Sequence, residues 1–266
     1  MSEDLRDIYS RSPEIFKRLR KEIDKVIVGQ DMAIEQLLVS LLAGGHALLE
    51  SNPGLAKTLL VKTTASCLGL DYSRIQCTPD LMPADITGTT IIEETETGKS
   101  FRFEAGPVFS NIVLADEINR ASPKTQSALL EAMQEKQVTV GNKTYLLDRP
   151  FFILATQNPI EMEGTFPLPE AQLDRFLLKI LLDYPGREEE MEILERYTVR
   201  SEPEVETVVS KEELLALQQL CRDIPVSDEI KSAVVELVLA TRSWPGVAYG
   251  ASPRATIGLI LSCKAR

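Results

Sequence analysis

The chain has 266 residues, of which 44% are hydrophobic and 26% charged, and these ordinary proportions allow a globular core of normal size. Its formal net charge of −11 counts against nonspecific nucleic-acid binding by the whole surface, because phosphate contacts need an excess of Lys and Arg. Its four cysteines lack C-x-x-C spacing, which favours free thiols in a reducing compartment. No apolar run nears the ~20 residues of a membrane span, and the N-terminus has no apolar signal region. We therefore expect a cytoplasmic location.

Two helices and a strand are predicted in the first fifty residues. RSPEIFKRLRKEIDKVIVGQ opens a helix with Ser12 as its cap and Pro13 at its first position, and Gly29 interrupts it. QDMAIEQLLVSLLAGG forms a second helix that ends at glycines. HALLE, residues 46–50, is a short apolar run between those glycines and a loop, which indicates a buried strand. KTLLVKTTASCLGL follows the loop as a helix.

Four more strands are predicted further along the chain, and helical segments separate several of them. One such helix is SPKTQSALLEAMQEK, with Ser122 as its cap. This alternation favours a parallel sheet covered by helices. Two hairpins interrupt the pattern: TIIEETETGKSFRFE, which turns near residues 97–99, and QVTVGNKTYLL, which turns at Gly141-Asn142. The four strands are residues 72–77, 111–116, 151–157 and 177–182.

The character of the chain changes after LDYPGREEE. From Arg187 onward the segments are helical and amphipathic, without a strand-like run. We therefore expect a boundary at Pro185-Gly186, with an α/β unit in residues 1–185 and a helical unit in residues 186–266. The apolar face of the last helix, from Pro253, finds no partner in the sequence, so we expect either that the helical unit is truncated or that it borrows packing from a neighbour.

The octapeptide after residues 46–50, SNPGLAKT, nearly matches the phosphate-loop pattern G-x-x-x-x-G-K-[ST] but lacks both glycines. Such a loop binds phosphate through backbone N–H groups at a helix N-terminus. Lys57 would place its charge on the β- and γ-phosphates, Thr58 would offer its hydroxyl to Mg²⁺, and Gly54 permits close approach. Ala56 is expected in the first helical turn, whereas Ser51 stands where a tight turn favours glycine. The octapeptide alone leaves a nucleotide site and an ordinary Asn-Pro-Gly turn equally open.

Two later strand ends carry polar residues that suit the same chemistry. NIVLADEINR ends a strand at Asp116-Glu117, where Asp116 would hold the Mg²⁺ shell and Glu117 would act as the base toward the attacking water. FFILATQNP ends a strand at Thr156, Gln157 and Asn158, and a neutral amide there can position water near the γ-phosphate. A solvated strand end and a plain Asn-Pro turn are the alternatives for these two segments.

Long segments of the chain resemble MoxR-type AAA+ ATPases. They include NPGLAKT, TPDLMPADITG, FRFEAGPVF, LADEINRASPKTQSALLEAMQE, VTVGNKTY, FFILATQNPIEMEGTFPLPEAQLDRF and GASPRA. The resemblance implies an AAA+ P-loop, nucleotide-binding α/β core in residues 1–185, with a five-stranded parallel sheet flanked by helices. It further implies a small helical lid domain in residues 186–266 that is incomplete at its C-terminal end, and assembly as a ring, commonly a hexamer. It also implies that the two hairpins are insertions facing the pore of the ring.

The same resemblance assigns the site residues. Asn158 would be the sensor-1 residue, Arg254 the sensor-2 arginine reaching the γ-phosphate from the lid, and Arg175 the finger acting on a neighbouring subunit. Arg120 is a rival finger, and Arg175 and Arg254 could instead form a surface pair or be solvated. Metal ligands would be Thr58 and Asp116, and Glu117 would be catalytic. The residues expected around ATP are Val28, Gly29, Asn52, Pro53, Gly54, Leu55, Ala56, Lys57, Thr58 and Leu59.

The function implied is Mg²⁺-dependent ATP hydrolysis, a reaction at an acid anhydride, coupled to chaperone-like maturation of a protein partner. Partners of the family include von Willebrand factor A-domain proteins. Two alternatives stay open: a nucleotide-binding scaffold with little hydrolysis, and a DNA-acting or chelatase-like AAA+ motor, against which the acidic balance counts.

Overall fold

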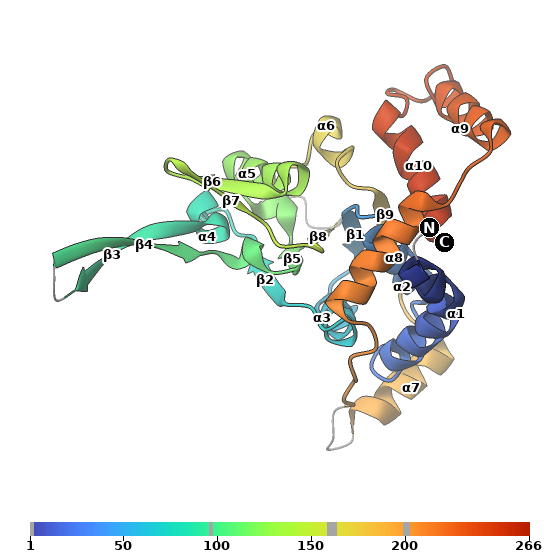
Figure 1. Cartoon of the computed structure of the whole chain (residues 1–266), viewed down its shortest axis with the longest axis horizontal. Helices are drawn as coiled ribbons and strands as arrows, with labels where there is room; N and C mark the ends of the chain where they lie inside the picture. Colours follow the sequence, from blue (N-terminus) through green and yellow to red (C-terminus); the bar gives the residue numbers. More distant parts are fainter. Residues whose placement is uncertain (1–2, 96–97, 159–163, 199–202) are drawn as a thin grey trace.

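The computed structural model of the protein describes residues 3–95, 98–158, 164–198 and 203–266. Its centre is a five-stranded parallel sheet in the order β2-β5-β8-β1-β9 (Figure 1). All five strands lie where the apolar runs predicted them, and the predicted parallel sheet is confirmed. The strands are β1 (Ala47–Ser51), β2 (Tyr72–Gln76), β5 (Ile112–Asp116), β8 (Phe152–Gln157) and β9 (Leu178–Leu182).

Helices cover both faces of this sheet because alternate residues of its central strands point to opposite sides. In β8, Phe152 and Leu154 join one apolar cluster, and Ile153 and Ala155 join the other. The first cluster contains residues of α1 (Glu3–Asp24), α2 (Asp31–Leu42), α3 (Lys57–Cys67) and α8 (Lys211–Asp223). The second contains residues of α4 (Pro83–Thr87) and α5 (Pro123–Glu135).

The start of the first helix corrects the sequence prediction. Helix α1 begins at Glu3, so Pro13 lies inside it and Ser12 is no cap. A proline within a helix has no N–H for the carbonyl four residues earlier. Here Ser12 Oγ donates to that carbonyl, Tyr9 O, at 2.9 Å. The predicted cap of α5 is confirmed, since Ser122 Oγ accepts from the Thr125 N–H at 3.4 Å.

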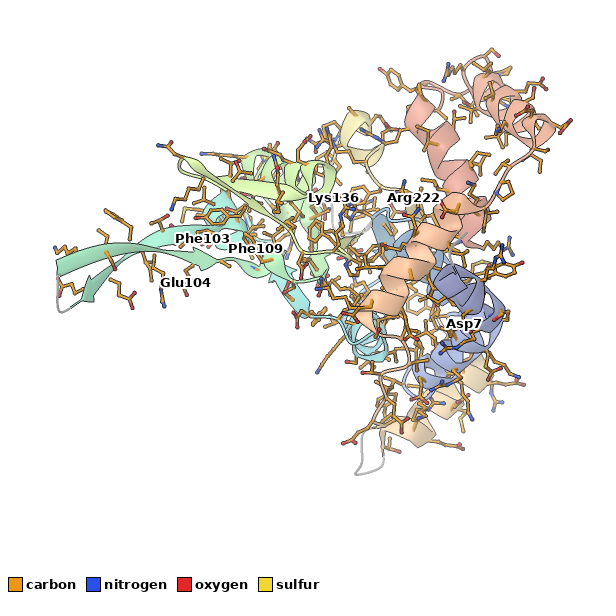
Figure 2. All side chains as sticks on the ribbon, in the orientation of Figure 1. Asp7, Phe103, Glu104, Phe109, Lys136 and Arg222 are labelled. Carbon is orange, nitrogen blue, oxygen red and sulfur yellow. The ribbon has the colours of Figure 1, made fainter. Side chains whose placement is uncertain are left out.

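Both predicted hairpins are present. β3 (Gly88–Thr95) pairs with β4 (Gly98–Ala105), and β6 (Gln137–Val140) pairs with β7 (Lys143–Leu146). The first turn falls partly on residues 96–97, outside the described residues. Figure 1 shows the β3–β4 hairpin extending away from the sheet. The Phe103 ring in β4 stacks on the Tyr145 ring in β7 with centroids 4.1 Å apart, and Phe109 packs edge-on against Phe103 (Figure 2). This aromatic group joins the bases of the two hairpins.

The chain beyond Arg187 is helical as predicted, with α7 (Arg187–Tyr197), α8, α9 (Asp228–Thr241) and α10 (Pro253–Ala265). Leu214 and Leu217 of α8 nevertheless belong to the same apolar cluster as α1 to α3, whereas α9 lies apart from the sheet (Figure 1). The division after residue 185 stays a prediction. Within the described ranges, no helix is both long and apolar enough to cross a lipid bilayer.

Candidate functional site

The backbone of the loop between β1 and α3 distinguishes positions 51 and 56, the two positions at which the phosphate-loop pattern has glycine. Positive φ values in this loop occur at Gly54 (83°) and Ala56 (54°). Ser51 is the last residue of β1 and is buried, so its position needs no glycine. Ala56 is the left-handed N-cap of α3 rather than part of its first turn, which corrects our expectation. Glycine is favoured at position 56 because a positive φ is sterically unfavourable for an L-residue with a Cβ atom.

The N-terminus of α3 is open toward the loop. Among the described residues no side chain caps this helix, and its first turn carries no carboxylate. The first of its N–H groups with a backbone acceptor is that of Leu60, which donates to Ala56 O at 2.9 Å. The N–H groups of Lys57, Thr58 and Leu59 precede it at the positive end of the helix dipole. Such an end binds anions, and phosphate in particular.

A cavity of about 260 Å³ lies beside this loop. Its lining is mostly apolar and brings together the loop, the segment before α2, the end of β9 and helix α7. Ile193 and Tyr197 of α7 were missed by the sequence analysis, although their i, i+4 spacing marks one helix face. The cavity suits a flat purine base next to a phosphate-binding loop. It is lined by Val26, Ile27, Val28, Gln30, Gly54, Leu55, Ala56, Leu59, Leu60, Leu182, Pro185, Ile193 and Tyr197.

Asp116 ends β5 at the same carboxyl edge of the sheet as the loop. One strand, β8, separates β5 from β1, so the two ends are two strand spacings apart, or about 10 Å. Thr156 Oγ1 donates to Asp116 Oδ1 at 2.6 Å, and Arg74 donates to Oδ2 from Nη2 at 2.6 Å and from Nε at 3.2 Å. Arg74 and the hydroxyl role of Thr156 were not predicted, because both depend on strand pairing.

Glu117 directly follows Asp116 and has a left-handed backbone, with φ of 56°. Its N–H donates to Thr156 Oγ1 at 2.9 Å. Its carboxylate accepts from Arg120 Nη1 at 3.1 Å and from Gln76 Nε2 at 3.3 Å. Arg120, the rival finger, therefore contacts Glu117 of its own chain.

Two further residues, Asn158 and Cys77, follow strands at this carboxyl edge of the sheet. Asn158 is buried just beyond β8. Burial raises the pKa of the Cys77 thiol to about 12, with Asp116 and Glu117 adding to the effect, so this thiol stays protonated. All four cysteines are free, as predicted.

The two other predicted arginines lie together at the opposite edge of the sheet. Leu177 N–H donates to His46 O at 2.7 Å, which sets Arg175 beside the amino ends of β1 and β9. Arg175 Nη1 donates to Leu130 O at 3.0 Å, and Arg254 forms an ion pair with Asp174 at 3.1 Å. Both arginines line one cavity of about 470 Å³. The five residues of β1, about 16 Å, separate this edge from the loop.

Comparison with known proteins agrees with this geometry. Residues 46–178 match the ATPase family associated with various cellular activities (AAA). The chain is 49% identical over 254 residues to Chaperone MoxR1 of Mycobacterium tuberculosis, a match covering 91% of this chain and 66% of that protein. It is 47% identical over 266 residues to the uncharacterized protein YeaC of Bacillus subtilis, covering 99% and 80%. The chain belongs to the MoxR-type AAA+ ATPases.

A solved structure agrees with this MoxR-type assignment. The crystal structure of a predicted ATPase from Cytophaga hutchinsonii matches with a TM-score of 0.89 at 45% identity, covering 99% of this chain and 83% of that one. The predicted family and fold class are thereby confirmed. Membership supports ATPase activity and nucleotide binding at the level of the family.

Proposed function

We propose that this MoxR-type protein hydrolyses Mg²⁺-bound ATP in a ring-shaped assembly, commonly a hexamer in its family, and uses that reaction to remodel a protein partner. The observation that carries the proposal is the open N-terminus of α3, which lies at the same sheet edge as Asp116. One side of the site can therefore bind phosphate, and the other can hold a metal ion.

The residues present suit this ligand. The cavity beside Val28 and Gly54 takes the base, and Lys57 with the first N–H groups of α3 binds the β- and γ-phosphates. Thr58 and Asp116 supply oxygen ligands for Mg²⁺, which keeps waters and uses phosphate oxygens for its remaining positions. Within the described residues no group of three or more His, Cys, Asp or Glu side chains could hold a metal ion. Bound Mg²⁺ would neutralise charge that develops on the phosphates.

The protein side chains would divide the remaining work. Glu117 would orient and deprotonate the attacking water, and Asn158 would hold that water near the γ-phosphate. Glu117 would first have to leave Gln76 and Arg120, which now hold its carboxylate. Arg175 and Arg254 lie at the amino edge of the sheet, about 16 Å along β1 from the loop of their own chain. Their shared position at the amino edge supports action on ATP held by a neighbouring subunit.

The client is proposed to be a protein. One relative is named a chaperone, and the β3–β4 hairpin carries an exposed apolar pair, Ile92 opposite Phe101, that could contact a client. Proteins with a von Willebrand factor A domain are the partner class we would test first. A scaffold with little hydrolysis and a DNA-acting motor are the alternatives.

The experiment compares ATP turnover of the protein with that of the Lys57→Ala and Glu117→Gln variants. Lys57→Ala is expected to weaken ATP binding about tenfold to a hundredfold, because a charge-assisted contact is lost. Glu117→Gln is expected to bind ATP without hydrolysing it and to retain the client in a pull-down. ATP binding without turnover in the unmodified ring would favour the scaffold. DNA binding with a steep salt dependence would favour the motor.

A further inference from the structure

A polar cavity lies at the amino edge of the sheet, opposite the carboxyl edge that carries the phosphate loop. Its volume is about 390 Å³, within the ~300–1,000 Å³ of pockets that take small ligands. Three cationic side chains line it from three separate segments: Lys136 after α5, Arg149 before β8 and Arg222 near the end of α8. No carboxylate is among its described lining residues. Figure 2 labels Lys136, just after α5, and Arg222, near the end of α8.

These three cations have no counter-ion in the described part of the chain. The ion pairs found there include none of them, although the sequence has 40 Asp and Glu against 29 Lys and Arg. The three acids next to them in sequence are engaged elsewhere. Glu135 accepts from Gln134 Nε2 at 2.9 Å. Asp148 pairs with Lys211, and Asp223 accepts from Gln219 Nε2 at 3.0 Å. The cavity therefore gathers positive charge in a protein whose net charge is negative.

The fold holds these charges together despite their repulsion. Burial lowers the pKa of the Lys136 ammonium, and Arg149 and then Arg222 lower it further. Lys136 is fixed by its backbone, because its N–H donates to Ala132 O and its carbonyl accepts from Leu147 N–H, both at 3.0 Å. Arg222 O accepts from Lys264 Nζ at 2.9 Å, which brings a fourth cation near. Like charges that face one another destabilise a fold unless an anion lies between them.

We propose that this cavity binds a small ligand carrying a phosphate group. A phosphate carries about −1.5 to −2 charges at pH 7, which matches three converging cations better than a single carboxylate does. Guanidinium groups bind phosphate through two parallel N–H bonds, and an ammonium adds a point charge. The volume leaves room for a small organic body. The ligand would be either free phosphate or a phosphate monoester.

The test is calorimetric titration with inorganic phosphate and, separately, with glycerol phosphate at constant ionic strength. The Lys57→Ala variant serves as the background, so that the nucleotide loop does not contribute. Binding is expected to saturate at one ligand per chain. Arg222→Gln and Arg149→Gln should each weaken it about tenfold to a hundredfold. Arg102→Gln, on the exposed β3–β4 hairpin, is the matched control and should leave it unchanged.

Thermal unfolding gives a second readout that does not depend on catalysis. Without phosphate, Arg222→Gln should unfold at a higher temperature than the background protein, because repulsion is relieved. At one phosphate concentration, the unfolding temperature of the background should rise more than that of Arg222→Gln. Tighter binding of glycerol phosphate would identify a monoester site, and equal binding a free-phosphate site. Equal affinity in Arg222→Gln and the background, or citrate binding as tightly as both phosphates, would overturn the proposal.

Discussion

Arg74 Nη2 lies 2.6 Å from Asp116 Oδ2, while Thr156 Oγ1 lies 2.6 Å from Asp116 Oδ1. The Asp116 side chain is 9% exposed and that of Arg74 45%. Both oxygens of the proposed Mg²⁺ ligand are thus engaged by protein donors. A metal ion and the Arg74 guanidinium would compete for Oδ2, since both are cations that approach the same atom.

Replacing Arg74 should separate its stabilising contact with Asp116 from its competition with Mg²⁺ for the same carboxylate. Arg74→Met is expected to lower the free energy of unfolding by about 1–3 kcal/mol in the absence of Mg²⁺, because a buried carboxylate loses its charged donor. The same variant should bind Mg²⁺ with ADP at a lower Mg²⁺ concentration. Urea unfolding and calorimetry with and without Mg²⁺ measure both. Arg102→Met is the control. An unchanged Mg²⁺ requirement would show that Arg74 and the metal do not compete.

Glycine substitutions at positions 51 and 56 are expected to change the free energy of unfolding in opposite directions, because the backbone conformations at the two positions differ. Ala56→Gly should raise the free energy of unfolding by up to about 1 kcal/mol, because relief of ~1–2 kcal/mol of left-handed strain exceeds the entropy cost of glycine. Ser51→Gly should lower it by about 0.5–1 kcal/mol, because Ser51 has a strand conformation.

ATP affinity is the second measurement on these variants. Ser51→Gly should change it by less than a factor of ten, about 1.4 kcal/mol. A much larger gain in affinity would mean that Ser51 weakens the native loop and would favour the scaffold.

Mixed assemblies test the proposed action of Arg175 across subunits. Arg175→Ala should bind ATP but lose hydrolysis, since a cation at the γ-phosphate can contribute ~10³–10⁵ in rate. Mixing it with Lys57→Ala should restore part of the turnover, because some interfaces then combine an intact loop with an intact arginine. Mixed rings that exchange subunits and yet remain inactive would contradict this prediction.

His46 should make stability depend on pH. Its Nδ1 accepts from Ile153 N–H at 3.0 Å, so its proton lies on Nε2, 3.1 Å from Met133 O. Burial lowers the pKa of His46 from 6.5 to about 4, and Lys136 adds to the lowering. Between these values the unfolded chain binds a proton that the folded chain does not. Stability is therefore fully retained above pH 6.5 and falls as the pH drops toward 4.

The His46→Gln variant isolates this contribution, since its amide can replace both hydrogen bonds. From pH 7 to pH 5 the unmodified protein should lose about 2 kcal/mol more of its unfolding free energy than the variant. Urea unfolding at several pH values provides the measurement. Parallel pH profiles for the two proteins would mean that His46 is not the responsible group.

Local sequence was sufficient wherever neighbouring residues decide the conformation. The apolar run at 112–116 is buried on both faces and forms a central strand, and Gly141-Asn142 closes its hairpin because those residues accept tight turns. Ser122 caps α5 through an N–H three residues away. Lys57, Thr58 and Asp116 were singled out for the same reason, since loop and strand end are short continuous segments.

The tertiary structure decided what depends on strand order and register. Thr156 meets Asp116 because β8 pairs beside β5, and Arg74 reaches the same carboxylate from β2. Arg175 and Arg254 are 79 positions apart in the sequence, yet both line one cavity at the amino edge of the sheet. Even the left-handed Ala56 is set by the strand and helix that the loop has to join. A pattern read along the chain cannot supply these contacts, because each is made between residues whose separation in sequence carries no information about their distance in space.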